Sequence, residues 1–220
     1  MSSDESLQPS DFAKLRQDYR QRTLDEGDVD PDPIRQFILW FNQAIESGAD
    51  SPNAMTLATT AADGSPSARV VLLQGVDHAG LTFYTNYLSR KARELDASQR
   101  ACLVFWWPEL ERQVRVDGTV TRVSAAESDA YFAKRPPDAR IGAAASPQSQ
   151  VIASRSVLED RFRQFHKQYP DGNVPRPEHW GGYRVSPTAF EFWQGRPSRL
   201  HDRILYTRSD AAWTIQRLSP

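Results

Sequence analysis

Cysteine is almost absent from this sequence of 220 residues, since Cys102 is the only one. A single thiol cannot form a disulfide within the chain and cannot build a cysteine-rich zinc site. The four histidines lack the spacing of metal ligands, so we expect no bound metal. Cys102 itself lies in the apolar run ACLVFWW, which favours its interpretation as a small buried hydrophobe.

Long apolar runs and an excess of charge are also missing. No apolar stretch approaches the length of a membrane-spanning helix, so no membrane partner is expected. The 27 lysines and arginines are balanced by 28 aspartates and glutamates, whereas nucleic-acid-binding proteins are usually clearly basic. We therefore expect no nucleic-acid partner. The acidic start MSSDESLQPSD does not resemble a signal peptide, which favours a reducing cytoplasmic location.

Glycine-rich nucleotide-binding loops do not occur, because neither GxGxxG nor a Walker motif is present. The residue pattern instead predicts strands over residues 54–60, 68–75, 81–86, 101–107, 112–123, 182–185, 189–194, 203–207 and 212–217. Helices are predicted over residues 12–22, 34–47, 89–99, 124–134 and 156–168, with a loop or short helix over 138–155. Strands joined by short turns favour a mainly β fold with flanking helices, an antiparallel barrel, over a doubly wound sheet.

The chain is expected to form one domain. Its first ten residues are small, polar and acidic, which predicts a disordered tail over residues 1–10. No internal repeat or low-complexity block divides the remainder, so residues 11–220 are expected to form a single domain.

The stretch EFWQGRPSRLHDR, residues 191–203, places Arg199, His201 and Arg203 at alternate positions near Trp193. In a strand these three side chains would share one face. Like charges side by side repel, so the arrangement is typical of a site for an anionic ligand with a flat ring. The alternative is an exposed edge strand kept basic against aggregation. His201 is suited to proton transfer near neutral pH, although it could also be a structural histidine bonded to the backbone.

A phosphate site is predicted at the start of the helix over residues 89–99, where Arg90 and Lys91 follow Ser89. A helix N-terminus has unpaired N–H groups and a partial positive charge, so cations placed there favour a bound anion. A solvated turn is the simpler interpretation of these residues alone. Arg69 supports the interpretation as an anion site, because it lies in the otherwise apolar strand ARVVLL and needs a partner such as a phosphate.

Other polar residues allow a functional and a structural interpretation. Gln113, in a predicted strand, either reads the edge of a heterocycle or is a satisfied core amide. Tyr131 and Arg135 share one helix face and form either a second anion site or a surface stack. Gln148 and Ser149 are uncharged polar groups that indicate little by themselves.

In their order and spacing, the blocks ARVVLL, FYTNYLSRKA, ERQVRV, YFAKRP, SPQSQ, PRPEHWGGYRVSP, FEFWQG, RLHDR and QRLSP resemble the pyridoxamine 5′-phosphate oxidase family over residues 12–220. The resemblance implies a split β-barrel homodimer with FMN at the subunit interface. It implies oxidation of pyridoxamine 5′-phosphate and pyridoxine 5′-phosphate to pyridoxal 5′-phosphate, with oxygen reduced to hydrogen peroxide.

The resemblance also implies the roles of individual residues. FMN would be contacted by Arg69, Tyr84, Thr85, Arg90, Lys91, Gln113, Gln148, Ser149, Trp193 and Arg203. The substrate would be contacted by Arg16, Tyr19, Gln74, Tyr131, Arg135, Arg199 and His201. Within this set, Tyr131 and Arg135 would hold the substrate phosphate. Arg199 and His201 would be the catalytic residues beside its ring.

Two residues depart from the family pattern at the substrate phosphate. Gln74 replaces a lysine, which removes a charge-assisted bond of about 1.5–3 kcal/mol, and Ala139 replaces a serine, which removes about 0.5–1.5 kcal/mol. Lys134 and Arg140 are candidates to replace them. Two alternatives therefore stay open. One is a related flavin oxidase or reductase acting on another small planar substrate, as in phenazine-pathway relatives; the other is a non-catalytic protein that binds FMN or pyridoxal phosphate.

Overall fold

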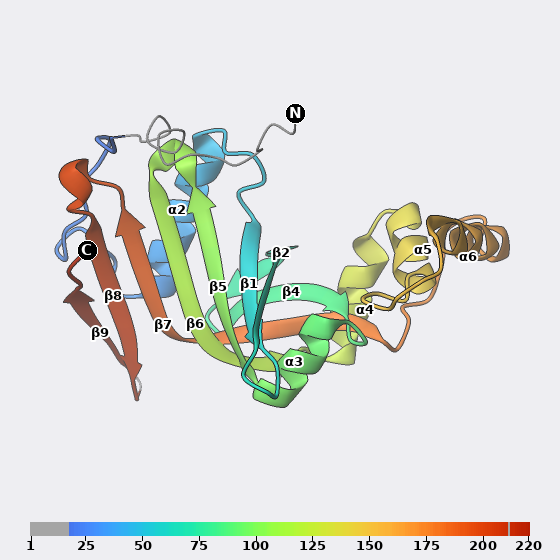
Figure 1. Ribbon diagram of the computed structural model, residues 1–220. Coiled ribbons are helices and arrows are strands. Elements are labelled where there is room, and N and C mark those ends of the chain that lie inside the picture. Colours follow the sequence, from blue (N-terminus) through green and yellow to red (C-terminus); the bar gives the residue numbers. More distant parts are fainter. Residues whose placement is uncertain (1–17, 211) are drawn as a thin grey trace, which may run out of the picture.

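The computed structural model describes residues 18–210 and 212–220, within which nine strands form one antiparallel sheet (Figure 1). The strands are β1 (Ala54–Thr60), β2 (Pro66–Leu72), β3 (Gly75–Asp77), β4 (Gly80–Asn86), β5 (Arg100–Trp107), β6 (Arg112–Arg122), β7 (Trp180–Gln194), β8 (Asp202–Ser209) and β9 (Ala212–Arg217). Their order is β2-β1-β5-β6-β7-β4-β3, and β8 pairs with β7 and β9. The sheet curls, because β4 crosses at a steep angle to β5 and β6 (Figure 1). The predicted mainly β fold is confirmed.

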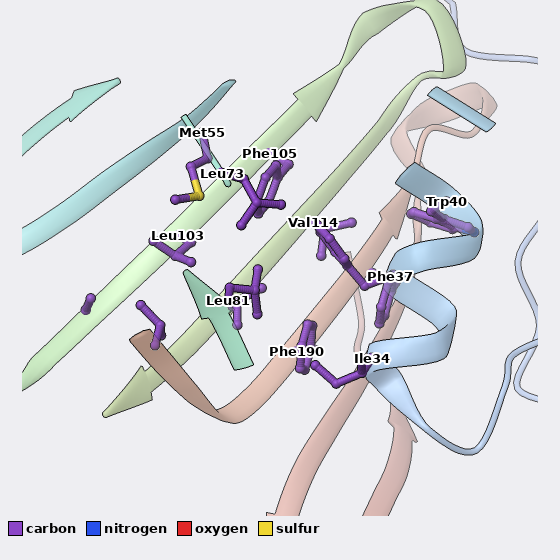
Figure 2. Close-up of a cluster of buried hydrophobic side chains, with 14 of the residues drawn as sticks. Ile34, Phe37, Trp40, Met55, Leu73, Leu81, Leu103, Phe105, Val114 and Phe190 are labelled. Atoms are coloured by element: carbon purple, nitrogen blue, oxygen red, sulfur yellow. The ribbon is translucent and has the colours of Figure 1, made fainter. Parts of the chain in front are cut away.

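Helix α2 (Pro33–Glu46) covers one face of the sheet and closes the main hydrophobic core (Figures 1 and 2). Its apolar side chains recur at helical spacing and point toward the strands. The ring of Phe37 lies 4.9 Å from that of Phe105, and the ring of Trp40 lies 5.2 Å from that of Phe192. The amphipathic helix predicted over residues 34–47 is therefore confirmed.

The described residues contain four more α-helices: α3 (Arg90–Ser98), α4 (Ala125–Lys134), α5 (Pro137–Ala145) and α6 (Arg155–Gln168). Helix α3 begins after Ser89, whose hydroxyl accepts from a backbone N–H of the first turn. Helix α4 begins with the predicted capping box of Ser124 and Glu127. Helices α5 and α6 pack on each other at the end of the molecule farthest from β9 (Figure 1). In the described part of the chain, no helix is both long and apolar enough to cross a membrane.

The structure differs from the predicted elements in the C-terminal half. Strand β7 is continuous where two strands were predicted, because a bulge relative to β6 accommodates Pro187, which has no N–H to donate. Gly118 lies opposite this bulge, and a Cβ there would approach the carbonyl oxygen of Ser186 to 2.5 Å. The loop or short helix expected over residues 138–155 does include a short helix, α5, which begins one residue earlier at Pro137.

The N-terminal half also differs from the predicted elements. The predicted strand over residues 68–75 ends at Leu72, so Gln74 lies in the connection to the short β3. Of the helix predicted over residues 12–22, residues 18–22 are not helical and the rest lies outside the described residues. The predicted tail over residues 1–10 also lies outside them.

Candidate functional site

A cavity of about 360 Å³ lies where β2, β4, α3, α4 and the start of β7 meet. Most of its lining consists of residues that the sequence had singled out. It is lined by Arg69, Gln74, Tyr84, Thr85, Lys91, Tyr131, Arg135 and Gln148, together with Val70, Val71, Leu72, Asn86 and Trp180. Eight predicted site residues, spread over 80 positions of the chain, therefore meet in one cavity.

Lys91 presents a half-buried ammonium group to this cavity. Its Nζ donates to Gln148 Oε1 at 2.9 Å, to Thr85 Oγ1 at 3.3 Å and to Ser89 Oγ at 3.4 Å. These acceptors are neutral, and among the described residues no carboxylate lies within ion-pair distance of Lys91. Burial and the neighbouring Arg69 lower the pKa of Lys91, and the charge of Glu94 offsets them only in part. The arrangement suits an anionic ligand.

Arg69 and Arg90 are tied instead to the buried carboxylate of Glu94. Arg69 Nη2 lies 3.3 Å from Glu94 Oε2, and Arg90 Nε donates to Glu94 Oε1 at 2.7 Å. Burial alone would raise the pKa of Glu94, but hydrogen bonds from Ser67, Thr59 and Arg90 outweigh it and lower the pKa to about 2. Arg69 therefore has a carboxylate partner within the protein, whereas the sequence analysis suggests a phosphate as its partner.

Sequence reasoning missed Glu94, although its position four residues after Arg90 on a predicted helix is an available signal for an ion pair. Arg90 is exposed and does not line the cavity.

Stacked aromatic rings form one wall of the cavity. The rings of Tyr84 and Tyr131 are parallel, 3.9 Å apart, and Trp180 stacks on Tyr84 at 5.6 Å. The Tyr84 ring also lies close to the backbone of Gly182. A Cβ at residue 182 would lie 2.7 Å from that ring, so the position of Tyr84 requires a glycine there. Trp180 was not among the predicted site residues; its place in the block HWGGY, before two glycines, was the available signal.

Arg135 lies against this wall, with its guanidinium carbon 4.7 Å from the centre of the Trp180 ring. Its Nη1 is buried and has no hydrogen-bond partner among the described residues. Burial lowers the pKa of Arg135. A buried donor without a partner costs free energy, which an anion in the cavity would remove.

The two residues proposed to replace the missing phosphate ligands do not reach the cavity. Lys134 is exposed and lines none of it, and Arg140 Nη1 donates to Asn173 Oδ1 at 3.4 Å. Ala139 lines an adjoining hollow that shares Arg135 with the main cavity. Neither residue therefore takes the place of the missing lysine at Gln74.

The remaining predicted residues form a second cluster, on β6, β7 and β8. Gln113 lies directly opposite Trp193, and Trp193 directly opposite Arg203, so the three share one face of the sheet. The ring of His201 lies 4.5 Å from that of Trp193, and the ring of Tyr19 lies 5.7 Å from it. None of these residues lines the cavity described above.

Arg199 and His201 do not join Arg203 in a strand, so the shared face that their alternate spacing would give in a strand does not form. Strand β8 begins at Asp202, and Ser198 and Arg199 adopt positive φ values of 56° and 62° in a turn after Pro197. Repulsion between like charges is relieved because Arg203 Nε donates to the buried Glu191 at 2.8 Å. Only Arg203 of the three belongs to the strand.

The turn positions the imidazole of His201. The backbone N–H of Arg196 donates to His201 Nδ1 at 3.1 Å, so Nδ1 carries no proton and the neutral ring carries it on Nε2. Burial and the nearby Arg199 lower the pKa of His201, which favours this neutral ring. His201 therefore offers a ligand an N–H donor rather than a free basic nitrogen.

Ser149, like Arg90, belongs to neither group. Ser149 is exposed, with φ 67°, and does not line the cavity although its neighbour Gln148 does. Arg16 lies outside the described residues.

Comparisons with known proteins agree with this geometry. A family model described as pyridoxamine 5′-phosphate oxidase matches residues 41–169, and one described as the pyridoxine 5′-phosphate oxidase C-terminal dimerisation region matches residues 180–220. A pyridoxine/pyridoxamine 5′-phosphate oxidase from Cyanothece sp. is 58% identical, covering 95% of this chain and 98% of its own length. One from Paraburkholderia phymatum is 60% identical, with 96% and 100% covered.

Solved structures share the fold. PhzG from Burkholderia lata 383, in complex with tetrahydrophenazine-1-carboxylic acid, has a TM-score of 0.85 at 30% identity, covering 90% of this chain and 98% of that one. An FMN binding protein related to pyridoxamine 5′-phosphate oxidase, from Nostoc punctiforme, has a TM-score of 0.70 at 20% identity, covering 87% of this chain and 100% of that one.

Proposed function

This chain belongs to the pyridoxamine 5′-phosphate oxidase family and has its split β-barrel fold, and from that we propose that it is an FMN-dependent oxidase of phosphorylated B6 vitamers. Pyridoxamine 5′-phosphate, oxygen and water would yield pyridoxal 5′-phosphate, ammonia and hydrogen peroxide; pyridoxine 5′-phosphate and oxygen would yield the aldehyde and peroxide. The observation that carries the proposal is a cavity in which Lys91 and Arg135 have no carboxylate partner among the described residues, beside a wall of stacked rings.

The cavity has the donors that a flavin phosphate requires. We assign the phosphate to Lys91 at the start of α3, where backbone N–H groups add a partial positive charge, with Arg69 of β2 in the same cavity lining. Arg90, which lies outside that lining, would approach the phosphate from the same turn of α3. Tyr84, Thr85, Gln148 and Ser149 complete this set in the proposal. FMN, when bound, supplies the redox chemistry by accepting two electrons from the substrate.

A second copy of the chain would complete the site. Gln113, Trp193 and Arg203 do not reach the cavity of their own chain, and residues 180–220 match a dimerisation region. Both places carry exposed apolar side chains: Val70, in the cavity lining, is 67% exposed, and Trp106, beside Trp193 in the second cluster, is 43% exposed. Such exposed apolar residues favour a contact between copies. We propose a homodimer in which the second cluster of one copy covers the cavity of the other, with residues 11–220 acting as one domain.

The substrate would lie between the two clusters. Tyr131 and Arg135 would hold its phosphate, with Gln74 nearby. Arg199 and His201 of the other copy, with Arg16 and Tyr19, would orient its ring. His201 would donate from Nε2 to a ring or 4′ substituent, holding the reacting carbon in place.

The test is the absorbance spectrum of the purified protein. A bound flavin gives a yellow protein, and anaerobic pyridoxine 5′-phosphate should bleach it; oxygen should restore the colour with one peroxide per aldehyde. A protein that stays colourless after incubation with FMN contradicts the proposal. A flavin that no B6 vitamer bleaches would indicate the non-catalytic alternative. The cytoplasmic location and the lack of a metal stay predictions.

A second candidate is a flavin enzyme that acts on an unphosphorylated planar substrate. It is favoured by Gln74 and Ala139 in place of a lysine and a serine, and by the similarity to PhzG solved with tetrahydrophenazine-1-carboxylic acid. Turnover of pyridoxine 5′-phosphate should be compared with that of pyridoxine. A strong preference for the phosphate ester excludes this candidate.

A further inference from the structure

Glu111 lies far from the cavity, in the turn between β5 and β6, and its carboxylate binds the backbone near the N-terminus. Glu111 Oε2 accepts from the N–H of Arg20 at 2.9 Å and from the N–H of Gln21 at 3.1 Å. Two successive amides donating to one carboxylate make a charge-assisted contact, which is stronger than a neutral one. These bonds span about 90 positions of sequence and attach residues 19–21 to the end of the sheet.

The same turn shapes the place where the Tyr19 ring lies. The backbone oxygen of Glu111 accepts from the N–H of Gly195 at 2.8 Å, which brings Gly195 beneath Tyr19. A Cβ on Gly195 would lie 2.6 Å from Tyr19 Cγ and 3.0 Å from Glu111 Cβ. Gly195 is therefore required by the close approach of Tyr19.

The position of Tyr19 places its ring against the second cluster. It meets the Trp193 ring edge-on at 5.7 Å and the His201 ring at 5.8 Å. Without the bonds to Glu111, Tyr19 would keep these ring contacts, which are worth about 0.5–1.5 kcal/mol each, and the next attachment along the chain would be the bond from Arg196 Nη1 to the backbone oxygen of Arg22 at 3.2 Å.

We propose that Glu111 is a positioning residue, whose carboxylate holds the backbone of Arg20 and Gln21 and thereby seats Tyr19 against Trp193 and His201. Its effect on turnover rests on the proposed function, since Tyr19 is there assigned to the substrate. The attachment itself does not depend on any substrate, so it can be tested separately.

The first test is hydrogen exchange of the flavin-loaded protein. Glu111→Gln keeps an acceptor but loses the charge, and Glu111→Ala removes both. Protection of the Arg20 and Gln21 amides should fall about 10-fold or more in the alanine variant, with the glutamine variant between it and the wild type. Glu109→Gln is the matched control, because Glu109 is an exposed acid of the same turn. Unchanged exchange in both Glu111 variants overturns the proposal.

The second test is a double-mutant cycle on the oxidation of pyridoxine 5′-phosphate. Glu111→Gln should raise KM about 10-fold with flavin affinity unchanged, and Gly195→Ala should act in the same direction. In a Tyr19→Ala background the effect of Glu111→Gln should shrink to less than about 2-fold. Additive effects, or lost protection with an unchanged KM, overturn the positioning role. A wild-type protein that oxidises no B6 phosphate contradicts the proposed function alone, and the exchange result still decides the attachment.

Discussion

The substitution Gln74→Lys should tighten the binding of the phosphorylated substrate. Gln74 lines the same cavity as Tyr131 and Arg135, and neither Lys134 nor Arg140 lines it. Arg135 Nη1 has no partner among the described residues, so it offers a phosphate a free donor in the cavity that Gln74 also lines. A lysine side chain is one atom longer than glutamine and ends in an ammonium group with three donors.

The magnitude follows from opposing contributions. A charge-assisted bond to a phosphate contributes about 1.5–3 kcal/mol. Ordering a lysine side chain costs up to about 1.5–2 kcal/mol, although a lysine confined by the cavity wall before binding loses less. Without ligand the new ammonium is repelled by Lys91 and Arg135, and a phosphate dianion relieves that repulsion. We expect a net gain of about 1–2 kcal/mol, which corresponds to a KM that is about 5- to 30-fold lower.

The assay is steady-state oxidation of pyridoxine 5′-phosphate and of pyridoxine, each by wild type, Gln74→Lys and Gln74→Met. Methionine matches glutamine in length without charge or donors, so it controls for shape. The KM for the phosphate ester should fall only in the lysine variant, and the KM for pyridoxine should not fall. An unchanged KM in Gln74→Lys, or an equal gain for pyridoxine, would refute the assignment of this end of the cavity to the substrate phosphate.

Three other predictions concern charges. Lys91→Met should weaken FMN binding about 10- to 100-fold by fluorescence titration, whereas Arg93→Met, exposed on the same helix, should not. The folded-state pKa of Glu94 is lowered from 4.5 to about 2, so its ionised carboxylate stabilises the folded state above pH 4.5 and this contribution is lost as the pH falls toward 2. The difference in unfolding free energy between wild type and Glu94→Gln, measured by urea unfolding, should therefore close over that pH range. Because burial and Arg199 lower the pKa of His201 below 6.5, the acid limb of kcat/KM should lie below that pH and move upward in Arg199→Gln, and a limb that stays in place contradicts the coupling.

Much of the secondary structure was predictable because its causes are local. The strand over residues 54–60 has its predicted bounds, and the helices after Ser89 and Ser124 begin at the predicted caps. Side-chain alternation, helical spacing and capping act within a few residues, so a single sequence contains them. Pro187 shows the limit of this local prediction. The sequence pattern predicted two strands separated around Pro187, whereas pairing with β6 makes them one strand with a bulge.

The sequence by itself determined which chemical groups are present: the cations, the amides, the aromatic rings and the two departures at Gln74 and Ala139. The tertiary structure decided which of them meet. It brought eight of the predicted residues into one cavity, gave Arg69 the carboxylate of Glu94, and left Trp193 in a separate cluster. It also placed His201 in a turn, where the N–H of Arg196 sets which ring nitrogen carries the proton. These outcomes depend on distances between residues far apart along the chain. Only the folded backbone sets those distances, and the interaction between two charges depends directly on the distance between them.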